Sequence, residues 1–357
     1  MRGLRLGYRV QIKFWRYELK LAHPWMISSG VGKGATHVFP VAIVQLTASD
    51  GTTGLGESAP SKRYKETAAG GIEFFEKVNA RKLSFDDVAG SMKYVEGIAP
   101  GNIAAKSAIN AALVDGAARK AGKAVHEFLG LGFKEKHHVT SFSIGIDQPE
   151  VIHKKVLEAA QYPVLKLKVG GPDDRENFKA LREAAPKKWV RVDANEGWTT
   201  KEQALEMVEW LATDGFVQFV EQPMPANTDP KDLAWLKSRS PLPLFGDESF
   251  HTARDVAQCV ECFHGVNLKF CKSGGISNGY EALAAARKAG LKTMIGCMIE
   301  TSILISAAAH LAELTDYLDI DGNLLITNDP YLGVTAEQGL LSFAHAPEKT
   351  GLRVRAR

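Results

Sequence analysis

Short apolar segments alternate with amphipathic segments along most of this chain. Runs of aliphatic and β-branched residues, such as VLKLKV (164–169) and VQFVEQP (217–223), are each followed by a stretch with helical periodicity. Apolar runs of this length are typical of strands buried on both faces, and the helical stretches would cover those faces. The alternation predicts a parallel sheet built from repeated strand–helix units.

The repeat begins near residue 139 and continues for eight strands. We expect the strands at 139–146, 164–169, 190–195, 217–223, 243–249, 266–272, 292–298 and 316–321. The helices between them are expected at 148–160, 173–185, 200–213, 230–238, 253–262, 280–289 and 301–314. This order predicts a closed α/β fold, a (β/α)7β barrel related to the TIM barrel.

The first 130 residues have a different pattern. Strand-like segments at 11–21, 38–47 and 54–57 precede helical segments at 67–78, 85–94 and 102–121, which predicts a separate α+β unit. With 357 residues, the chain is long enough for a barrel and an accessory domain. We expect an α+β capping domain at 1–133, a barrel at 134–324, and a turn-rich tail at 325–357 that folds back to complete the cap.

The composition is that of an ordinary globular protein, with 45% hydrophobic and 24% charged residues. The net charge of +3 is too small to indicate a nucleic acid or an anionic membrane as partner. No run approaches the roughly 18 apolar residues of a membrane span, and Lys13 and Arg16 interrupt any secretory signal behind the basic N-terminus. We therefore expect a cytoplasmic protein whose cysteines are reduced thiols: Cys259, Cys262, Cys271 and Cys297.

Charged residues recur at the ends of the predicted barrel strands. Lys168, Asp193, Glu221, Asp247 and Lys272 follow one another at intervals of 25 to 28 residues, which is about the length of one strand–helix unit. Parallel barrel strands bring their C-terminal ends to one face, where barrels of this type carry their active sites. The spacing predicts that these five side chains gather at the mouth of the barrel.

Three of these residues, Asp193, Glu221 and Asp247, are acids on consecutive strands. Neighbouring strands lie roughly 5 Å apart, so the three carboxylates can converge on one ion. Carboxylates this close repel one another unless a cation neutralises them. Oxygen ligands favour a hard divalent ion, Mg²⁺ first, with Mn²⁺ as a substitute. Solvated loop acids are the alternative, and the near-equal spacing argues against them.

Two lysines flank the acids. Lys166 and Lys168 are two positions apart on one strand, so both point into the barrel, whose outer face is covered by helices. Lys272 ends a strand four units along and is therefore expected across the mouth from Lys168. Two lysines on opposite sides of a metal-bound substrate are what a two-base proton transfer needs. Glu248, next to Asp247, is expected to orient Lys272.

Five motifs together resemble the muconate lactonising subgroup of the enolase superfamily: KLK (166–168), VDANEGW (192–198), EQP (221–223), DES (247–249) and KSGG (272–275). Two further segments, GCMIETS (296–302) and DIDGNLL (319–325), resemble the dipeptide epimerases of that subgroup. The resemblance implies Mg²⁺ on the three acids, with Lys168 and Lys272 as the acid–base pair. The reaction it implies inverts the α-carbon of the C-terminal residue of a dipeptide through an enediolate.

The resemblance also implies the substrate contacts. Lys166 would help to hold the substrate carboxylate, and Asp319 and Asp321 would bind the free α-ammonium group of the dipeptide. Two more residues match positions near the dipeptide, Ser143 and Cys297. The supporting positions it implies are Asn195, Glu248 and Lys269. Barrels of this superfamily are often oligomeric, so a homo-oligomer is one option.

Specificity in the epimerases that this chain resembles lies in two capping loops, which correspond here to residues 25–34 and 58–65. The first loop contains Trp25, Ser29 and Lys33, and the second contains Arg63 among three basic residues. These basic groups could receive an acidic side chain, as in the Ala-Glu epimerases that act on murein peptides. One branch of those enzymes has an arginine in the first loop, where this chain has Ser29 and Gly30. Solvated loop charges are the alternative interpretation.

Three other kinds of function fit parts of the sequence. Within the same subgroup, o-succinylbenzoate synthesis, N-succinylamino acid racemisation and cycloisomerisation use substrates without a free ammonium group, so a role for Asp319 and Asp321 argues against them. A Schiff-base aldolase would use a barrel lysine as its nucleophile. A non-catalytic barrel would be expected to have lost a metal ligand or a lysine, and none is missing here.

Overall fold

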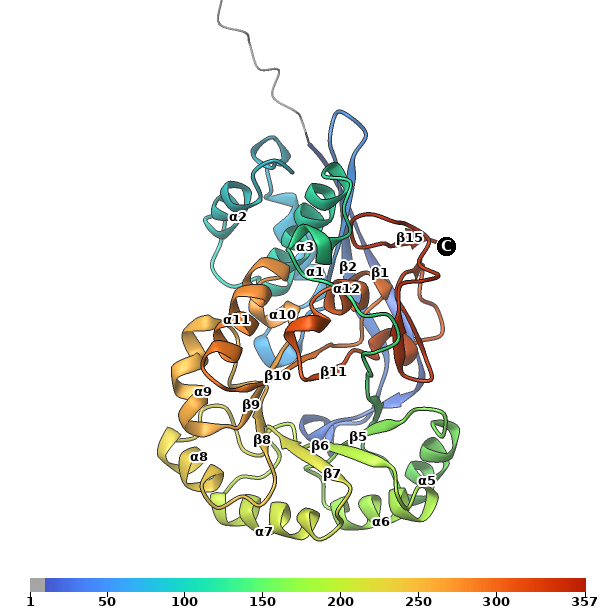
Figure 1. Ribbon diagram of the computed structural model, residues 1–357, viewed down its shortest axis with the longest axis vertical. Helices are drawn as coiled ribbons and strands as arrows, with labels where there is room; N and C mark the ends of the chain where they lie inside the picture. Colours follow the sequence, from blue (N-terminus) through green and yellow to red (C-terminus); the bar gives the residue numbers. More distant parts are fainter. Residues whose placement is uncertain (1–9) are drawn as a thin grey trace, which may run out of the picture.

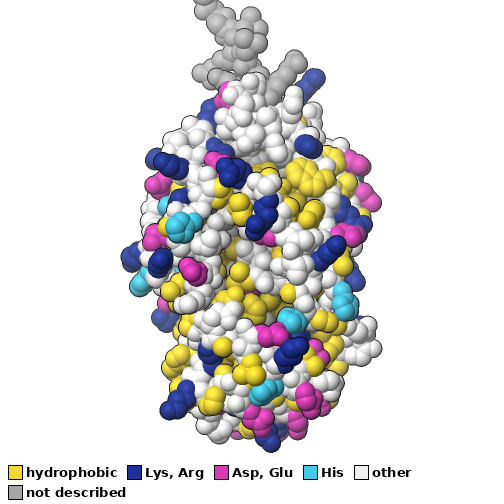
Figure 2. Space-filling model, turned by 90° about the vertical axis from the view of Figure 1, so that its right-hand side faces the viewer, with side chains coloured by type: hydrophobic (Ala, Val, Ile, Leu, Met, Phe, Trp, Pro, Cys, Tyr) yellow, Lys and Arg dark blue, Asp and Glu magenta, His cyan; other side chains and the backbone are white. Residues whose placement is uncertain are grey.

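The structure is a computed structural model that describes residues 10–357, so the expectation about a secretory signal concerns residues that lie partly outside the described part. A strand-rich unit formed early in the chain lies above a ring of strands and helices (Figure 1). Charged side chains of both signs are mixed over the face shown in Figure 2, as the small net charge suggests. Among residues 10–357, none of the helices combines the length and apolar character needed to span a membrane.

The capping unit is an antiparallel sheet in the order β1-β2-β3, packed against helices. Its elements are β1 (Gln11–Trp25), β2 (Thr36–Thr47), β3 (Thr53–Ser58), α1 (Ala68–Glu76), α2 (Val88–Glu96), α3 (Ile103–Lys120) and α4 (Val125–Phe128). The alanine-rich α3 lies directly on β3. A Cβ atom at Gly54 or Gly56 would lie 1.9 Å from a carbonyl oxygen of α3, so only glycine permits this approach.

The barrel is a sheet of eight parallel strands in sequential order. They are β4 (Phe142–Ile144), β5 (Val164–Lys168), β6 (Trp189–Asp193), β7 (Val217–Glu221), β8 (Leu244–Gly246), β9 (Gly265–Leu268), β10 (Lys292–Gly296) and β11 (Tyr317–Asp319). A parallel bridge between Thr140 and Leu318 joins the first and last strands. The predicted (β/α)7β barrel with an N-terminal α+β cap is thereby confirmed.

Helices surround the barrel on its outer side (Figure 1). They are α5 (Pro149–Glu158), α6 (Asp174–Ala184), α7 (Lys201–Ala212), α8 (Pro230–Lys237), α9 (Val256–Cys262), α11 (Ile276–Lys288) and α12 (Ser302–Ala309). On β5, Leu165 and Leu167 belong to the apolar core, whereas Lys166 and Lys168 pair with acids inside the barrel. The alternation along this strand therefore has the predicted direction.

The predicted strand at 266–272 is wrong in its second half. β9 ends at Leu268, and the next residues form a single helical turn, α10 (Phe270–Ser273). Gly274 and Gly275 follow with φ of 88° and 108°, which lets the chain turn directly into α11. Lys272 therefore lies on a helical turn beyond the strand end. The last predicted helix is also shorter, because α12 ends at Ala309 and a 3-10 turn follows.

The tail forms two small antiparallel pairs, β12 (Tyr331–Leu332) with β15 (Arg355–Ala356), and β13 (Thr335–Glu337) with β14 (Leu340–Ser342). Its end packs on the cap. The Leu352 N–H donates to Asp115 on α3 at 2.7 Å, and Val125 at the start of α4 donates to the Gly351 carbonyl at 2.9 Å. The tail thus folds back onto the N-terminal unit.

Candidate active site

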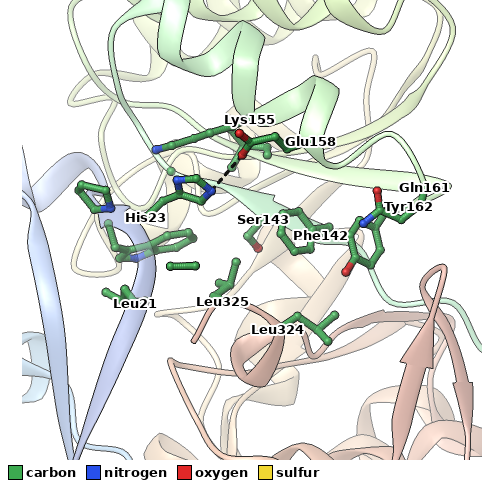
Figure 3. Close-up of a pocket in the computed structure, with 15 residues that line it drawn as sticks. Leu21, His23, Phe142, Ser143, Lys155, Glu158, Gln161, Tyr162, Leu324 and Leu325 are labelled. Atoms are coloured by element: carbon green, nitrogen blue, oxygen red, sulfur yellow. Dashed lines mark ion pairs between the residues drawn. The ribbon is translucent and has the colours of Figure 1, made fainter. Parts of the chain in front are cut away.

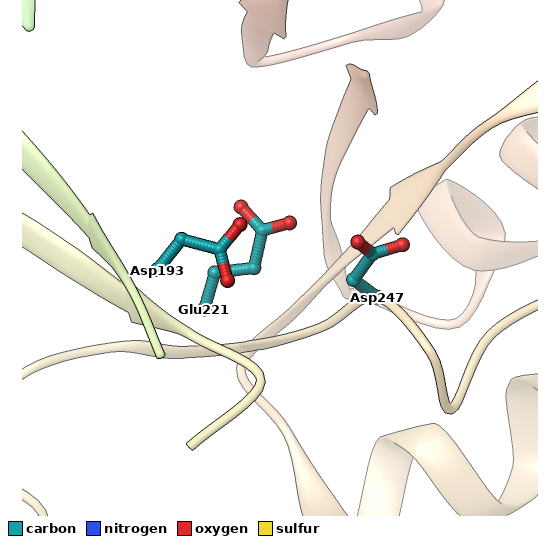
Figure 4. A group of neighbouring side chains, drawn as sticks. All are labelled: Asp193, Glu221 and Asp247. Carbon is teal, nitrogen blue, oxygen red and sulfur yellow. The ribbon is translucent and has the colours of Figure 1, made fainter. Parts of the chain in front are cut away.

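The ends of β6, β7 and β8 bring three carboxylates together, as Figure 4 shows. Parallel pairing places Asp193 beside Glu221, and Glu221 beside Phe245, and Asp247 is the first residue after β8. One oxygen from each acid lies within 4.8 Å of the others, and all three side chains are buried. The strand spacing alone was therefore sufficient to predict this cluster.

These three acids fit a hard divalent cation. They offer only carboxylate oxygens, which are the ligands that Mg²⁺ prefers. Burial, followed by the nearby Asp193, raises the pKa of Glu221 to about 7, because three negative charges cannot easily share this space. One oxygen of Glu221 also has no hydrogen-bond donor of suitable geometry. Asp193, Glu221 and Asp247 would hold Mg²⁺ here.

The two predicted acid–base lysines contact opposite ends of this row of acids. Lys168 Nζ lies 2.6 Å from Asp193, and Lys272 Nζ lies 2.6 Å from Asp247. Lys272 also donates to the carbonyl oxygens of Phe250 and Asn267. Within residues 10–357, the hydrogen bonds that orient Lys272 come from Asp247 and backbone carbonyls, and not from Glu248 as expected.

Two further lysines lie between and beside the acids. Lys166 Nζ is fully buried and lies within 3.0 Å of three carboxylates, those of Asp193, Glu221 and Asp319. Burial would lower the pKa of Lys166, but these acids raise it well above its usual value, so the side chain stays protonated. Lys269 pairs with Asp247 at 2.7 Å and is held protonated in the same way.

The two acids at the end of β11 have different surroundings. Asp319 accepts hydrogen bonds from Ser141 and Lys166, and the lysines keep its pKa low in spite of burial. Asp321 accepts the backbone N–H of Ser143 at 2.6 Å. Burial and the neighbouring Asp319 raise the pKa of Asp321 to about 7. Asp319 is thus paired with Lys166 inside the barrel. Of these two acids, Asp321 is the one that lacks a cationic partner in the described contacts.

The remaining predicted site residues lie around this cluster. Cys297 follows β10, with its sulfur 3.8 Å from Asp321. The Asn195 backbone N–H donates to Asp193 at 2.9 Å, and the Asn195 side chain reaches Glu248 at 3.5 Å. Burial and Asp247 raise the pKa of Glu248 to about 8. Asn195 and Glu248 therefore adjoin the triad, whereas Cys297 adjoins Asp321.

The predicted specificity residues do not all point into one place. Ser29 and Lys33 are exposed on the first capping loop. On the second loop, Arg63 donates two hydrogen bonds to the Glu196 carboxylate, from Nε at 2.6 Å and from Nη2 at 2.9 Å. Trp25 is half-buried and packs against Gly145 after β4. The structure thus pairs Arg63 with an acid of the barrel.

A pocket of about 260 Å³ lies beside β4 (Figure 3). Its walls come from the end of β1, from β4 and α5, and from Leu324–Leu325. His23 and Glu158 form an ion pair of 3.0 Å at this pocket. Of the predicted site residues, Ser143 and Trp25 line it. The pocket therefore adjoins the Asp321 side of the site and does not contain the carboxylate triad.

Sequence reasoning missed several residues that shape the site. Asn267 on β9 donates to Glu221 at 2.7 Å, and Gln222 accepts the backbone N–H of Asp247 at 2.8 Å. Arg191, two positions before Asp193 on β6, donates to the carbonyl of Leu318 across the barrel. The inward-facing alternation of β6 and β9 is a signal that could have identified Arg191 and Asn267.

Two known domain families match this chain. Residues 16–130 match the N-terminal domain of the mandelate racemase/muconate lactonizing enzyme family, and residues 152–351 match the enolase C-terminal domain-like family. The chain belongs to the mandelate racemase/muconate lactonizing enzyme family, since its N-terminal and C-terminal domains both match. The buried acidic triad and the lysines on the barrel strands occur within the second of these matched regions.

Individual relatives narrow the comparison. The chain is 72% identical, over 98% of its length and 100% of the relative, to a protein of Pedosphaera parvula named L-Ala-D/L-amino acid epimerase. It is 35% identical to the L-Ala-D/L-Glu epimerase of Bacteroides thetaiotaomicron, over 96% of this chain and 88% of that one. Among solved structures, the dipeptide epimerase of Cytophaga hutchinsonii complexed with Mg and D-Ala-L-Val is similar with a TM-score of 0.90 at 27% identity, covering 99% of this chain and 96% of that one.

Proposed function

We propose that this protein is a Mg²⁺-dependent dipeptide epimerase, an isomerase that inverts the α-carbon of the C-terminal residue. The observation that carries the proposal is that Lys168 and Lys272 contact opposite ends of the carboxylate triad. A substrate carboxylate held through a cation on the triad would present its α-carbon between the two lysine side chains, one a neutral amine that accepts a proton and the other an ammonium group that delivers one. Removing a proton on one side and delivering a proton on the other inverts that carbon.

The other charged side chains have supporting tasks. When Mg²⁺ is bound at the triad, it stabilises the negative charge that develops on the substrate carboxylate as the α-proton leaves. Lys166 remains positively charged because three acids surround it, so it contributes charge to the carboxylate site and does not exchange protons. Lys269 holds Asp247 from the side away from Lys272, through the other carboxylate oxygen.

Asp321 supports a dipeptide as the substrate. It is buried at the barrel mouth, and its described contacts are neutral donors, the backbone of Ser143 and the thiol of Cys297. A buried carboxylate without a cationic partner is costly, and an ammonium group would remove that cost. N-Succinylamino acids, o-succinylbenzoate precursors and muconates do not carry this group, which disfavours the related reactions.

Two observations bear on which dipeptides are used. The relative that is 72% identical is named for L-alanine first and a variable second residue. Arg63, one of the basic loop residues that could receive an acidic second side chain, is paired with Glu196. We therefore place L-Ala-L-Xaa dipeptides first, with no requirement for glutamate.

The four free cysteines support a reducing compartment, the cytoplasm.

Deuterium incorporation tests the proposal. A library of dipeptides is incubated in D₂O with the protein and Mg²⁺, and each accepted dipeptide gains one deuterium at its second α-carbon. Asp321→Asn is expected to weaken binding of L-Ala-L-Xaa while leaving the fold intact. N-Succinylamino acids are the comparison substrates. Exchange of these compounds without exchange of any dipeptide would contradict the proposal, and retention of activity in EDTA would contradict the metal requirement.

A further inference from the structure

The two capping loops contact two adjacent residues of the barrel. In the first loop, the Ser28 hydroxyl donates to the Asn195 carbonyl at 2.6 Å. In the second loop, Arg63 donates to both carboxylate oxygens of Glu196, at 2.6 and 2.9 Å. Asn195 and Glu196, hereafter the docking segment, follow the metal-ligating Asp193 by two and three residues. Ser28 and Arg63, which lie 63 − 28 = 35 residues apart in the sequence, thus reach the barrel beside the same proposed metal ligand, Asp193.

The docking segment has an unusual backbone that the barrel holds in place. Asn195 and Glu196 have φ of 42° and 66°, in the left-handed region that residues other than glycine rarely adopt. The Asn195 N–H donates to Asp193 at 2.9 Å, and the Glu196 N–H donates to the Gln222 carbonyl at 2.9 Å. Strained backbone conformations of this kind persist where the surrounding structure enforces them, and they cluster at functional sites.

The first loop lies on the barrel only because glycines make room for it. A Cβ atom at Gly170, after β5, would lie 2.8 Å from the Cβ of Ser28. A Cβ atom at Gly197, directly after the docking segment, would lie 3.2 Å from that atom and 2.5 Å from the Gly170 Cα. The close approach of Ser28 therefore depends on the loops that follow the strands of Lys168 and Asp193.

In the second loop, the guanidinium of Arg63 is engaged by a fixed partner. Glu196 is only 15% exposed, and one of its oxygens also accepts the Ala226 N–H at 2.8 Å. A bidentate pair between arginine and a carboxylate is among the strongest and most directional contacts in proteins. The neighbouring Tyr64 packs edge-on against His251, with ring centres 5.5 Å apart. The second loop is therefore attached to the barrel by two adjacent loop residues, through Arg63 on Glu196 and through Tyr64 on His251.

We propose that Arg63 is a positioning residue that closes the second capping loop on the docking segment, and that it is not the receptor for an acidic substrate side chain. This inference rests on the proposed dipeptide epimerase function. The closed loops exclude water from the acid–base lysines and support Asp193 through Asn195. Loss of the Arg63–Glu196 pair should consequently weaken the use of every dipeptide to a similar degree, whatever its second side chain.

Three variants separate a positioning residue from a receptor: Arg63→Gln, Glu196→Gln and the double variant. Steady-state kcat and KM are measured with L-Ala-L-Glu and L-Ala-L-Leu. We expect kcat/KM to fall by about 10- to 100-fold for both dipeptides in each single variant, because misplacement of a supporting group costs rates of this order. The double variant should be no worse than either single variant, since both remove the same contact.

A receptor role predicts the opposite results. Arg63→Gln would then impair L-Ala-L-Glu alone, and Glu196→Gln would free the guanidinium and improve that dipeptide. Either result overturns the inference. The matched control is Arg175→Gln, which removes an exposed arginine–carboxylate pair with Glu206 on the outside of the barrel and should leave both dipeptides unaffected.

Hydrogen exchange separates failure of this inference from failure of the proposed function. Amides at 61–65 should lose protection in Arg63→Gln and keep it in Arg175→Gln, a result that does not depend on the substrate. If the wild type turns over no dipeptide but Arg63→Gln shows this loss of protection, the loop contact is supported and the epimerase proposal is contradicted. Unchanged protection at 61–65 in Arg63→Gln would contradict the positioning role directly.

Discussion

Replacing Lys272 by methionine removes one ammonium group and keeps most of the side-chain volume. Lys272 is 3% exposed, and its Nζ atom donates to the Asp247 carboxylate at 2.6 Å and to the carbonyls of Phe250 and Asn267 at 2.8 and 3.1 Å. All of these hydrogen bonds are lost together in the variant. The substitution therefore removes the proposed acid–base group and one internal cation at the same time.

The two consequences can be given separate magnitudes. Removing one partner of a buried ion pair costs about 3–5 kcal/mol of unfolding free energy. Lys269 remains 2.7 Å from the other oxygen of Asp247, so we expect the lower end, about 3 kcal/mol. Loss of a general acid–base group costs about 10²- to 10⁴-fold in rate, or roughly 3–5 kcal/mol of activation free energy.

Deuterium exchange shows which of the two lysines still works. In Lys272→Met, Lys168 remains in place, so one epimer should still exchange its α-proton in D₂O while inversion to the other epimer is lost. Lys168→Met should show the mirror result with the other epimer. Thermal unfolding of both variants confirms that they are folded. If the two variants exchange the same epimer, or if either still epimerises near the wild-type rate, the two-base assignment is refuted.

Three further predictions concern the metal, the cap and pH. EDTA should abolish epimerisation, Mg²⁺ or Mn²⁺ should restore it, and Mg²⁺ should raise the Tm of the wild type but not of Asp247→Asn. Gly56→Ala should lower stability by about 1–3 kcal/mol or more in denaturant unfolding, because its Cβ would lie 1.9 Å from a carbonyl oxygen of α3, whereas Gly132→Ala, with no atom within 4 Å, should not. Burial raises the pKa of Glu57 to about 7 from 4.5, so its contribution to stability should be full below pH 4.5 and fall by about 3 kcal/mol as the pH rises to 7. Glu57→Gln should lack this decline, and a wild-type profile parallel to that of the variant would contradict the effect.

The periodic parts of the chain were predictable, and the local contacts were not. The interval between charged strand ends was enough to place Asp193, Glu221 and Asp247 together, because parallel strands impose their own spacing. Lys272 was assigned to a strand that ends four residues earlier. The apolar run continues through Phe270 and Cys271, and the hydrophobic pattern of so short a segment does not distinguish strand from helix.

The partner of Arg63 could not be predicted from spacing. Arg63 and Glu196 lie 133 residues apart on different structural units, so their contact depends on how the cap sits on the barrel. Glu196 also adopts a left-handed backbone conformation, which only the glycine that follows it could have suggested. A basic loop beside an active site is therefore weak evidence for an acidic substrate when the barrel can supply the acid itself.

The chemistry and the choice of substrate are carried by different parts of the molecule, and the contacts between them differ in kind. The body of the cap is fixed to the barrel by buried contacts, such as the Glu57 carboxylate that accepts both the N–H and the hydroxyl of Thr301. The two capping loops, in contrast, reach the barrel at the docking segment through Ser28 and Arg63. A substitution in these loops can change closure without moving the strand ends that hold the triad. Loop variants that break these two contacts should therefore lower kcat/KM for every dipeptide before they change metal affinity, whereas variants of the strand ends should remove the reaction itself.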